Sequence, residues 1–301
     1  TWGAREMSTA QIFDIKRFAV HDGDGIRTTV FFAGCPLRCL WSHTPEGLSA
    51  SPRLASYAHN CTLCGRCAAV CPCGVHHIQG GEHLLDRSRC TACRACVQVC
   101  GGEALKLYGR TYSVGELLPL LTEDRDFYEN SGGGVTLSGG ECLLQPDFCA
   151  ELLGALKSQG IRTAVDTCGF VPREAFDKVM PYTDIFLYDI KAIDEQTHLR
   201  YTGQSNRIIL ENLRYIDRCG KHTEIRIPYV PGVNDDQIAK IGEFLQTLHG
   251  ITAVKILPYH SYAAAKYAAL GMENTFSAHI PSDAEMSAAR QILREYGLVC
   301  I

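Results

Sequence analysis

The chain has 301 residues, of which 46% are hydrophobic and 21% are charged, and its formal net charge is −4. This length allows one large domain or two ordinary ones, and the charge offers no broad electrostatic surface for nucleic acid. No apolar run approaches the roughly 20 residues of a membrane-spanning helix, and no secretory signal is visible. We expect contact with neither nucleic acid nor membrane. Met7 is expected to be the native start, preceded by an expression remnant.

Outside residues 50–106, the predicted elements alternate between strands and helices. Six short runs have the mostly apolar pattern of strands buried on both faces: Thr28–Ala33, Val135–Ser138, Thr163–Thr167, Ile185–Asp189, Glu224–Pro228 and Ala253–Leu257. Helical segments are expected at Asp147–Ser158, Arg173–Met180, Asn206–Cys219, Asp235–His249 and Ser282–Tyr296. Repeated β–α units imply a parallel sheet with right-handed crossovers. We predict an α/β fold, an open, partial (β/α)6 barrel, with a doubly wound sheet as the alternative.

A cysteine-rich stretch at residues 50–106 interrupts this alternation. Two runs of C-x2-C-x2-C-x3-C begin 29 residues apart, and this is the ligand pattern of paired [4Fe-4S] clusters in bacterial ferredoxins, where the fourth cysteine of each run serves the other cluster. One cluster would have the ligands Cys61, Cys64, Cys67 and Cys100, and the other Cys90, Cys93, Cys96 and Cys71. Cys73 is interpreted as non-ligating. We predict a ferredoxin-like insert at 50–106, folded around its clusters, within a domain made of 8–49 and 107–301.

Disulfides and zinc are the two other interpretations of the sixteen cysteines. A disulfide scaffold is disfavoured because the chain is too long for one, lacks an export signal and groups its thiols at metal-ligand spacings. Zinc is disfavoured because zinc ribbons use separated C-x2-C pairs. The iron–sulfur interpretation predicts a reducing, anaerobic cytoplasm.

Polar residues follow or end all six predicted strands. They include Cys35, Cys39 and Ser42 after the first strand, Ser138–Glu141, Asp166–Thr167, Asp189 with Lys191, Arg226 and His260. Functional residues of parallel α/β proteins lie at the carboxyl ends of the strands. Six polar strand ends in succession therefore predict one shared site.

These stretches together resemble the glycyl-radical-enzyme activating enzymes, a branch of the radical S-adenosylmethionine (SAM) superfamily. The resemblance runs from Ile12 onward and rests on HDGDGIRT at 21–28, GCPLRC at 34–39, the double cluster insert, SGGE at 138–141 and RIPYVPGVND at 226–235. It implies a third [4Fe-4S] cluster, held by three thiolates, whose open iron binds SAM. It further implies reductive cleavage of SAM to a 5′-deoxyadenosyl radical, which abstracts hydrogen from a glycine of a partner glycyl radical enzyme.

The resemblance also implies roles for single residues. The cluster ligands would be Cys35 and Cys39, with Ser42 at the third ligand position. The SAM amino group would lie against Gly139, Gly140 and Glu141, where glycine permits close backbone contact. A monovalent cation beside the SAM carboxylate would be held near Asp166, Thr167 and Asp189. The SAM carboxylate or the glycyl substrate loop would contact Lys191 and Arg226, and the adenosine would lie near His260.

Ser42 departs from the family pattern, which has cysteine at this position. A hydroxyl is a poor, hard ligand for a cubane iron. Three hypotheses remain open: the site is disabled, Ser42 ligates as an alkoxide, or a nearby thiol substitutes. Cys142, which follows SGGE, is the candidate for such a thiol, although a small buried residue is the favoured interpretation of it.

Two other classes of function compete with the activase hypothesis. The chain could be an electron-transfer iron–sulfur protein, or a regulatory partner that binds SAM without radical chemistry. The expected partners are a glycyl radical enzyme and an electron donor such as flavodoxin or ferredoxin, and we expect a monomer. The segment 260–274 is a candidate lid, in which Tyr262, Tyr267 and Leu270 would pack over the site, and packing in a helix core is the equal alternative.

Overall fold

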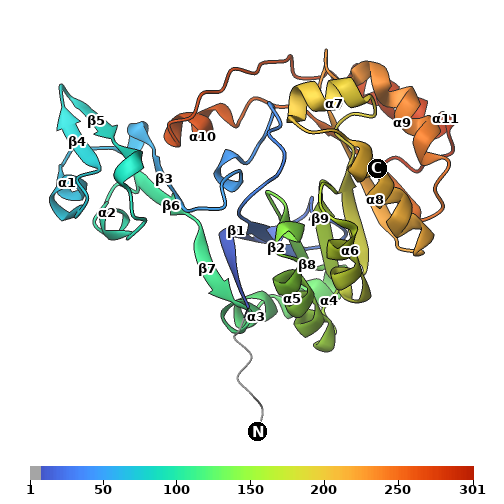
Figure 1. The fold of residues 1–301 in the computed structure, drawn as a ribbon, viewed down its shortest axis with the longest axis horizontal. Helices are drawn as coiled ribbons and strands as arrows, with labels where there is room; N and C mark the ends of the chain where they lie inside the picture. Colours follow the sequence, from blue (N-terminus) through green and yellow to red (C-terminus); the bar gives the residue numbers. More distant parts are fainter. Residues whose placement is uncertain (1–7) are drawn as a thin grey trace, which may run out of the picture.

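An eight-stranded sheet lies at the centre of the computed structural model, which describes residues 8–301 (Figure 1). The strand order is β12-β11-β10-β9-β8-β2-β1-β7. The strands are β1 (Thr9–Ala19), β2 (Arg27–Phe32), β7 (Arg110–Ser113), β8 (Gly134–Gly139), β9 (Thr163–Thr167), β10 (Ile185–Asp189), β11 (Thr223–Tyr229) and β12 (Ile251–Pro258). The expectation about Met7 lies outside the described residues.

The six predicted strands correspond to the six parallel strands, β2 and β8 to β12. These strands follow one another in chain order, without the reversal that defines a doubly wound sheet. The antiparallel strands β1 and β7 at one edge are not predicted from the sequence. In β1 the charged residues Asp14, Lys16 and Arg17 are exposed or half-buried, so its second half lacks the apolar signal of a central strand.

Helices connect the parallel strands. Those of the main body are α3 (Val114–Thr122), α4 (Arg125–Ser131), α5 (Pro146–Ser158), α6 (Arg173–Val179), α7 (Glu195–Thr202), α8 (Arg207–Arg218), α9 (Ile238–Leu245), α10 (Ala264–Ala269) and α11 (Asp283–Glu295). The helix predicted at Asp235–His249 is shorter, because a 3-10 turn at Asp235–Gln237 precedes α9. Ser282 caps α11 through a capping box with Glu285, as its position predicts. Within residues 8–301, no helix combines the length and apolar character needed to cross a bilayer.

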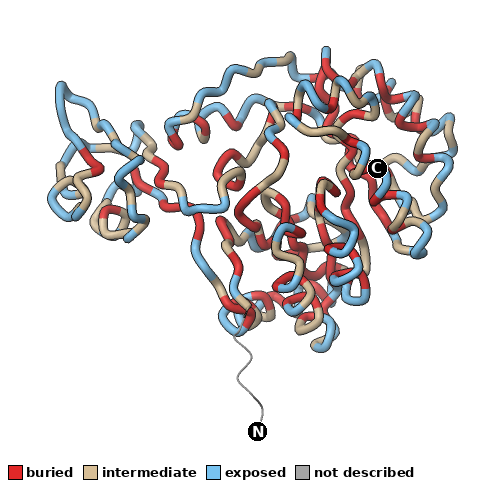
Figure 2. The backbone as a smooth tube through the Cα atoms, viewed as in Figure 1, coloured by how far each residue is buried: buried red, intermediate tan, exposed pale blue. Residues whose placement is uncertain are grey.

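The cysteine-rich segment stands to one side of the main sheet (Figure 1) and has few buried residues (Figure 2). Its strands β3 (Arg53–Ser56) and β6 (Leu105–Tyr108) pair with each other, as do β4 (His76–Gln79) and β5 (Glu82–Leu85). Two short helices, α1 (Arg66–Val70) and α2 (Ala95–Gln98), complete it. Its small apolar core consists largely of cysteine side chains, together with residues such as Leu54, Val75 and Leu105.

A second apolar cluster joins this segment to the main body. Leu270, which follows α10, packs with Phe13 of β1, Ala55 of β3 and Tyr108 of β6. Arg87 fixes the same junction, since its guanidinium donates to the carbonyl oxygens of Leu54 (3.0 Å) and Ala269 (2.8 Å).

The candidate lid at 260–274 therefore differs from the expectation. Tyr267 and Leu270 are buried in helix packing, whereas Tyr262 is 77% exposed. The alternative of core packing applies to Leu270, which helps to hold the cysteine-rich segment. Tyr267 is instead buried beside Ser42 of the loop after β2.

Close backbone contact joins the end of β8 to the loop that follows β2. Gly140 N donates to the carbonyl oxygen of Phe32 (2.8 Å), and Glu141 N donates to that of Gly34 (2.8 Å). A Cβ atom on Gly140 would lie only 2.2 Å from the Gly34 oxygen and 2.6 Å from the Gly47 oxygen. Only glycine fits there without moving backbone, so this residue sets the distance between the two loops.

We predict that Gly140→Ala destabilises the fold by at least about 2 kcal/mol, because the added methyl group overlaps backbone atoms that cannot rotate away. Thermal unfolding followed by circular dichroism measures the effect as a lowered melting temperature. Gly154→Ala in α5 is the matched control, since its Cβ would lie 3.5 Å from the Tyr182 ring, an ordinary contact. Equal melting temperatures for the two variants would contradict the role given to Gly140.

Candidate active site

A cavity of about 310 Å³ opens at the carboxyl ends of the parallel strands. Nine of the predicted site residues line it: Cys35, Cys39, Ser42, Gly139, Gly140, Asp166, Asp189, Lys191 and Arg226. Side chains from β8, β9, β10 and β11 thus meet the loop after β2 at one place. Three predicted residues, Glu141, Thr167 and His260, are not among its lining.

The Glu141 carboxylate points into the protein. It is fully buried and accepts hydrogen bonds from Thr167 Oγ1 (2.9 Å) and from the backbone N–H groups of Leu143 (3.0 Å) and Cys168 (2.8 Å). Burial raises its pKa. Glu141 and Thr167 therefore tie the end of β8 to the end of β9, and neither side chain faces the cavity.

Arg226 lies among three acidic residues. Its guanidinium is 3.3 Å from Asp166, 3.5 Å from Glu224 and 3.6 Å from Asp22, and it donates to the His21 carbonyl oxygen. Burial lowers the pKa of Arg226, but the surrounding carboxylates outweigh this and leave the pKa above its ordinary value. Burial raises the pKa of Asp166 to about 6, against the opposing effect of Arg226.

A second ion pair, between Lys191 and Asp189, forms part of the cavity lining. Lys191 Nζ is 2.6 Å from Asp189 Oδ2, and both side chains are largely buried. Burial lowers the pKa of Lys191, but the negative charge of Asp189 and its hydrogen bond outweigh this effect, so the ammonium stays charged. The site thus presents fixed positive and negative charges side by side, which suits a zwitterionic ligand.

His260 reaches the site indirectly. Its ring stacks on His43, with centroids 3.8 Å apart, and His43 lines the cavity. Burial, followed by the neighbouring His260, lowers the pKa of His43 to about 4. Four residues that were not predicted from the sequence also line the cavity: Asp22, Trp41, His43 and Tyr259. Their place beside the GCPLRC stretch or at strand ends was the available signal.

Three thiols among residues 8–301 line this cavity: Cys35, Cys39 and Cys168. Burial raises the pKa of Cys39 to about 12, whereas a hydrogen bond from Cys168 lowers the pKa of Cys35. Cys142 is fully buried, and its Sγ is directed at the carbonyl oxygens of Leu137 and Asp166, each 3.6 Å away. The hypothesis that Cys142 substitutes for a ligand at position 42 is therefore wrong for this geometry, and the favoured interpretation of a small buried residue fits it.

The remaining cysteine runs surround two further cavities. Cys61, Cys64, Cys67 and Cys100 line one of about 240 Å³, the first thiol cavity. Cys71, Cys90, Cys93 and Cys96 line the other, the second thiol cavity, together with Cys73. The fourth cysteine of each run thus faces the thiols of the other run. Four soft thiol donors around one space fit a [4Fe-4S] cluster.

The two runs also adopt the same backbone. Leu63 and Ala92, each two residues after the first cysteine, both have φ of +57°. Gly65 and Arg94, two residues further on, have φ of +74° and +66° and cap α1 and α2. Left-handed residues of this kind are uncommon outside glycine, and they turn successive N–H groups toward a concavity that suits an anionic group.

Comparisons with known proteins identify the family of this chain. A family model, the radical SAM superfamily, matches residues 29–245. A choline trimethylamine-lyase activating enzyme of Oleidesulfovibrio alaskensis is 40% identical, covering 95% of this chain and 96% of that protein. A trans-4-hydroxy-L-proline dehydratase activating enzyme of Clostridioides difficile is 41% identical, and the match covers 85% of this chain and 86% of that protein. In fold alone, SuiB of Streptococcus suis is similar, with a TM-score of 0.50 and 15% identity over 62% of this chain and 42% of that chain. The chain belongs to the radical SAM superfamily and, within it, to the activating enzymes of glycyl radical enzymes.

Proposed function

We propose that the strand-end cavity binds SAM beside a cluster at Cys35 and Cys39, and that the insert carries two further [4Fe-4S] clusters. When bound, a reduced cluster supplies the electron for SAM cleavage, and the resulting 5′-deoxyadenosyl radical takes hydrogen from a glycine of the partner. This proposal rests on one observation. Soft thiols, the two glycines Gly139 and Gly140, and two buried ion pairs lie together in the lining of one cavity. The electron-carrier and regulatory alternatives are not favoured, because the matched relatives are activating enzymes.

The domain organisation follows from the strand order. We infer that residues 8–49 and 107–301 form a partial (β/α)6 barrel and that 50–106 form a ferredoxin-like insert. In support, the parallel strands follow chain order, and β12 and β7 at the two sheet edges do not pair with each other. An open barrel of this kind leaves its carboxyl-end cavity accessible to a partner's loop.

Roles within the cavity follow from charge and position. The backbone of Gly139 and Gly140 offers a surface for the SAM amino group, while Glu141 positions that backbone from behind. Lys191 and Arg226 supply positive charge for the SAM carboxylate or the partner's glycyl loop. Asp166 and Asp189 are the carboxylates that a monovalent cation would use, and Thr167 orients the loop between them through Glu141. His260 supports His43 next to the adenosine.

The partner is a glycyl radical enzyme, and the two relatives activate a lyase and a dehydratase. We propose a partner of the same broad kind, which breaks a bond adjacent to a carbon radical. Flavodoxin or ferredoxin would supply electrons to the insert clusters. A monomer in a reducing cytoplasm suits a chain with this many free thiols.

We predict that Ser42→Cys increases reductive SAM cleavage at least tenfold, because the hydroxyl at position 42 is a weak ligand for cluster iron. The measurement is 5′-deoxyadenosine formed after anaerobic reconstitution and chemical reduction, compared with the unchanged chain.

Cys168→Ala is the control for this experiment, because Cys168 is the remaining thiol of the cavity lining. If Cys168 serves as the third ligand, Ser42→Cys will change little, and Cys168→Ala will lose the iron of this site. That result would contradict the weak-ligand account and replace Ser42 with Cys168 in the ligand set.

The crosswise arrangement, in which the fourth cysteine of each run serves the cluster of the other run, can be tested separately. Cys71→Ala should disturb the cluster of Cys90, Cys93 and Cys96, because Cys71 faces the second thiol cavity. Electron paramagnetic resonance of the reduced protein should show one of the two insert signals altered. Cys73→Ala is the matched control in the same cavity and should leave both signals unchanged. Loss of the signal assigned to Cys61, Cys64 and Cys67 would contradict the crosswise arrangement.

A further inference from the structure

Two histidines lie between the two thiol cavities. His76 begins β4, and His83 lies in β5, where it pairs with Ile78. Both side chains are on one face of the hairpin, because directly opposed residues and residues two apart share a face. His76 lines the second thiol cavity, and His83 lines the first.

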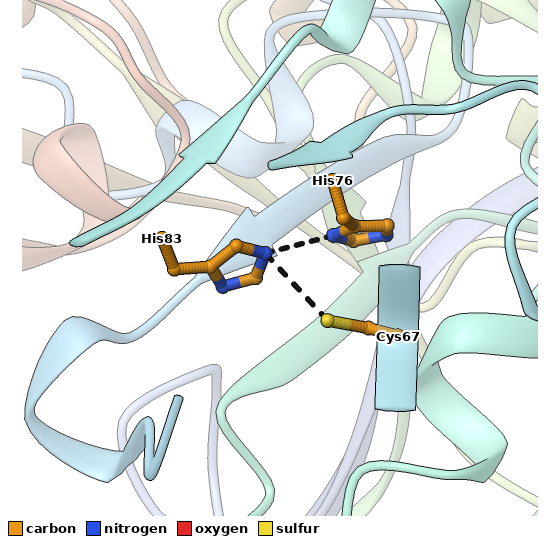
Figure 3. Close-up of side chains that lie close together, drawn as sticks. All are labelled: Cys67, His76 and His83. Carbon is orange, nitrogen blue, oxygen red and sulfur yellow. Dashed lines mark hydrogen bonds between the residues drawn. The ribbon is translucent and has the colours of Figure 1, made fainter. Parts of the chain in front are cut away.

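The two rings contact each other, and His83 also contacts Cys67 (Figure 3). His76 Nδ1 lies 2.9 Å from His83 Nε2. His83 Nε2 also lies 3.7 Å from Cys67 Sγ, and His83 Nδ1 lies 3.7 Å from Cys61 Sγ. One imidazole therefore reaches two of the four thiols of the first thiol cavity, and the second imidazole fixes its orientation.

The protonation of this pair is determined by its partners. A neutral imidazole carries one N–H and one acceptor nitrogen, so each ring can donate one hydrogen bond and accept one. A thiolate that binds iron has no proton and can only accept. His83 must then carry its proton on Nδ1 to bond Cys61, which leaves Nε2 to accept from His76 Nδ1. His76 Nε2 is then the unprotonated nitrogen of its ring. This atom is buried and has no hydrogen-bond partner.

A separate metal ion is the competing explanation for this cluster of side chains. The ligand atoms of Cys67, His76 and His83 lie within 4.8 Å of one another, close enough to hold one ion. Two observations favour hydrogen bonding instead. Cys67 is one of the four thiols around the first thiol cavity, and the 2.9 Å between the two histidine nitrogens is a hydrogen-bond distance.

We propose that His83 donates an N–H···S hydrogen bond to Cys61 and so raises the reduction potential of the cluster in the first thiol cavity, with His76 as the positioning residue. Hydrogen bonds to cluster sulfurs have this effect because they stabilise the added negative charge of the reduced form. Among the described residues, the four proposed ligands in the second thiol cavity (Cys71, Cys90, Cys93 and Cys96) have no hydrogen bond to a histidine, and Cys71 accepts a hydrogen bond from Val75 N (3.4 Å). The two clusters are therefore unequal, and the first is the easier to reduce. This inference rests on the two-cluster insert proposed above.

The test is a redox titration of the full chain, followed by electron paramagnetic resonance, in a Cys35→Ala, Cys39→Ala background so that only the insert clusters contribute. His83→Phe keeps a planar ring and removes both nitrogens. We expect the iron content to remain at about eight per chain, the sum for two [4Fe-4S] clusters. We also expect one of the two midpoint potentials to fall while the other stays constant.

Two further variants complete the design. His77→Phe is the matched control, because His77 is exposed and lies on the opposite face of the same hairpin. His76→Leu should lower the same potential by a smaller amount, because His83 keeps its N–H but loses the group that orients it.

The outcomes separate this inference from the proposed function. Unchanged potentials in His83→Phe, or an equal shift in His77→Phe, would overturn the hydrogen-bond role. Loss of about four irons in His83→Phe, or zinc bound in place of iron, would assign His83 to metal ligation and overturn it as well. If the parent background itself holds no insert clusters, the two-cluster proposal fails first, and the role of His83 fails with it.

Discussion

The cavity depends on one backbone contact, the approach of Gly139 and Gly140 to the loop after β2. Three hydrogen bonds connect Gly140 to Phe32, Glu141 to Gly34 and Gly34 to Gly47. A methyl group at position 140 would collide with two of these carbonyl oxygens. The loop that carries Cys35 and Cys39 is therefore held against the end of β8 by main-chain atoms, which gives the thiols a fixed position relative to the other strand ends.

Glu141 extends this contact to the neighbouring strand. Its carboxylate accepts from Thr167 and from the backbone of Cys168, so β8, β9 and the thiol-bearing loop form one connected unit. Burying a carboxylate is costly unless hydrogen bonds compensate, and here several donors do so. The ion pairs of Arg226 and Lys191 follow the same rule, since each buried cation has a carboxylate within 3.3 Å. The site is polar, and each of its buried cations is already paired with a carboxylate before any ligand enters.

Sequence periodicity predicts the parallel strands well, because a strand buried on both faces leaves a continuous apolar run. It fails for β1, whose second half lies beyond its pairing with the edge strand β7 and mixes charged and apolar residues. Spacing likewise predicts which thiols gather in the insert, since a short loop constrains its own cysteines. The inward orientation of Glu141 could not be predicted, because it depends on how β8 and β9 pack together. The burial of Cys142 agrees with the interpretation favoured from the sequence.

The junction at Leu270 and Arg87 has a consequence for the order of folding. Arg87 contacts Ala269, a residue 182 positions later in the chain. Contacts of such high sequence separation form late, because a long loop must close before they are gained. On the ribosome, the cysteine-rich segment emerges well before the residues that dock it. Its thiols consequently spend a period of synthesis outside the finished interface.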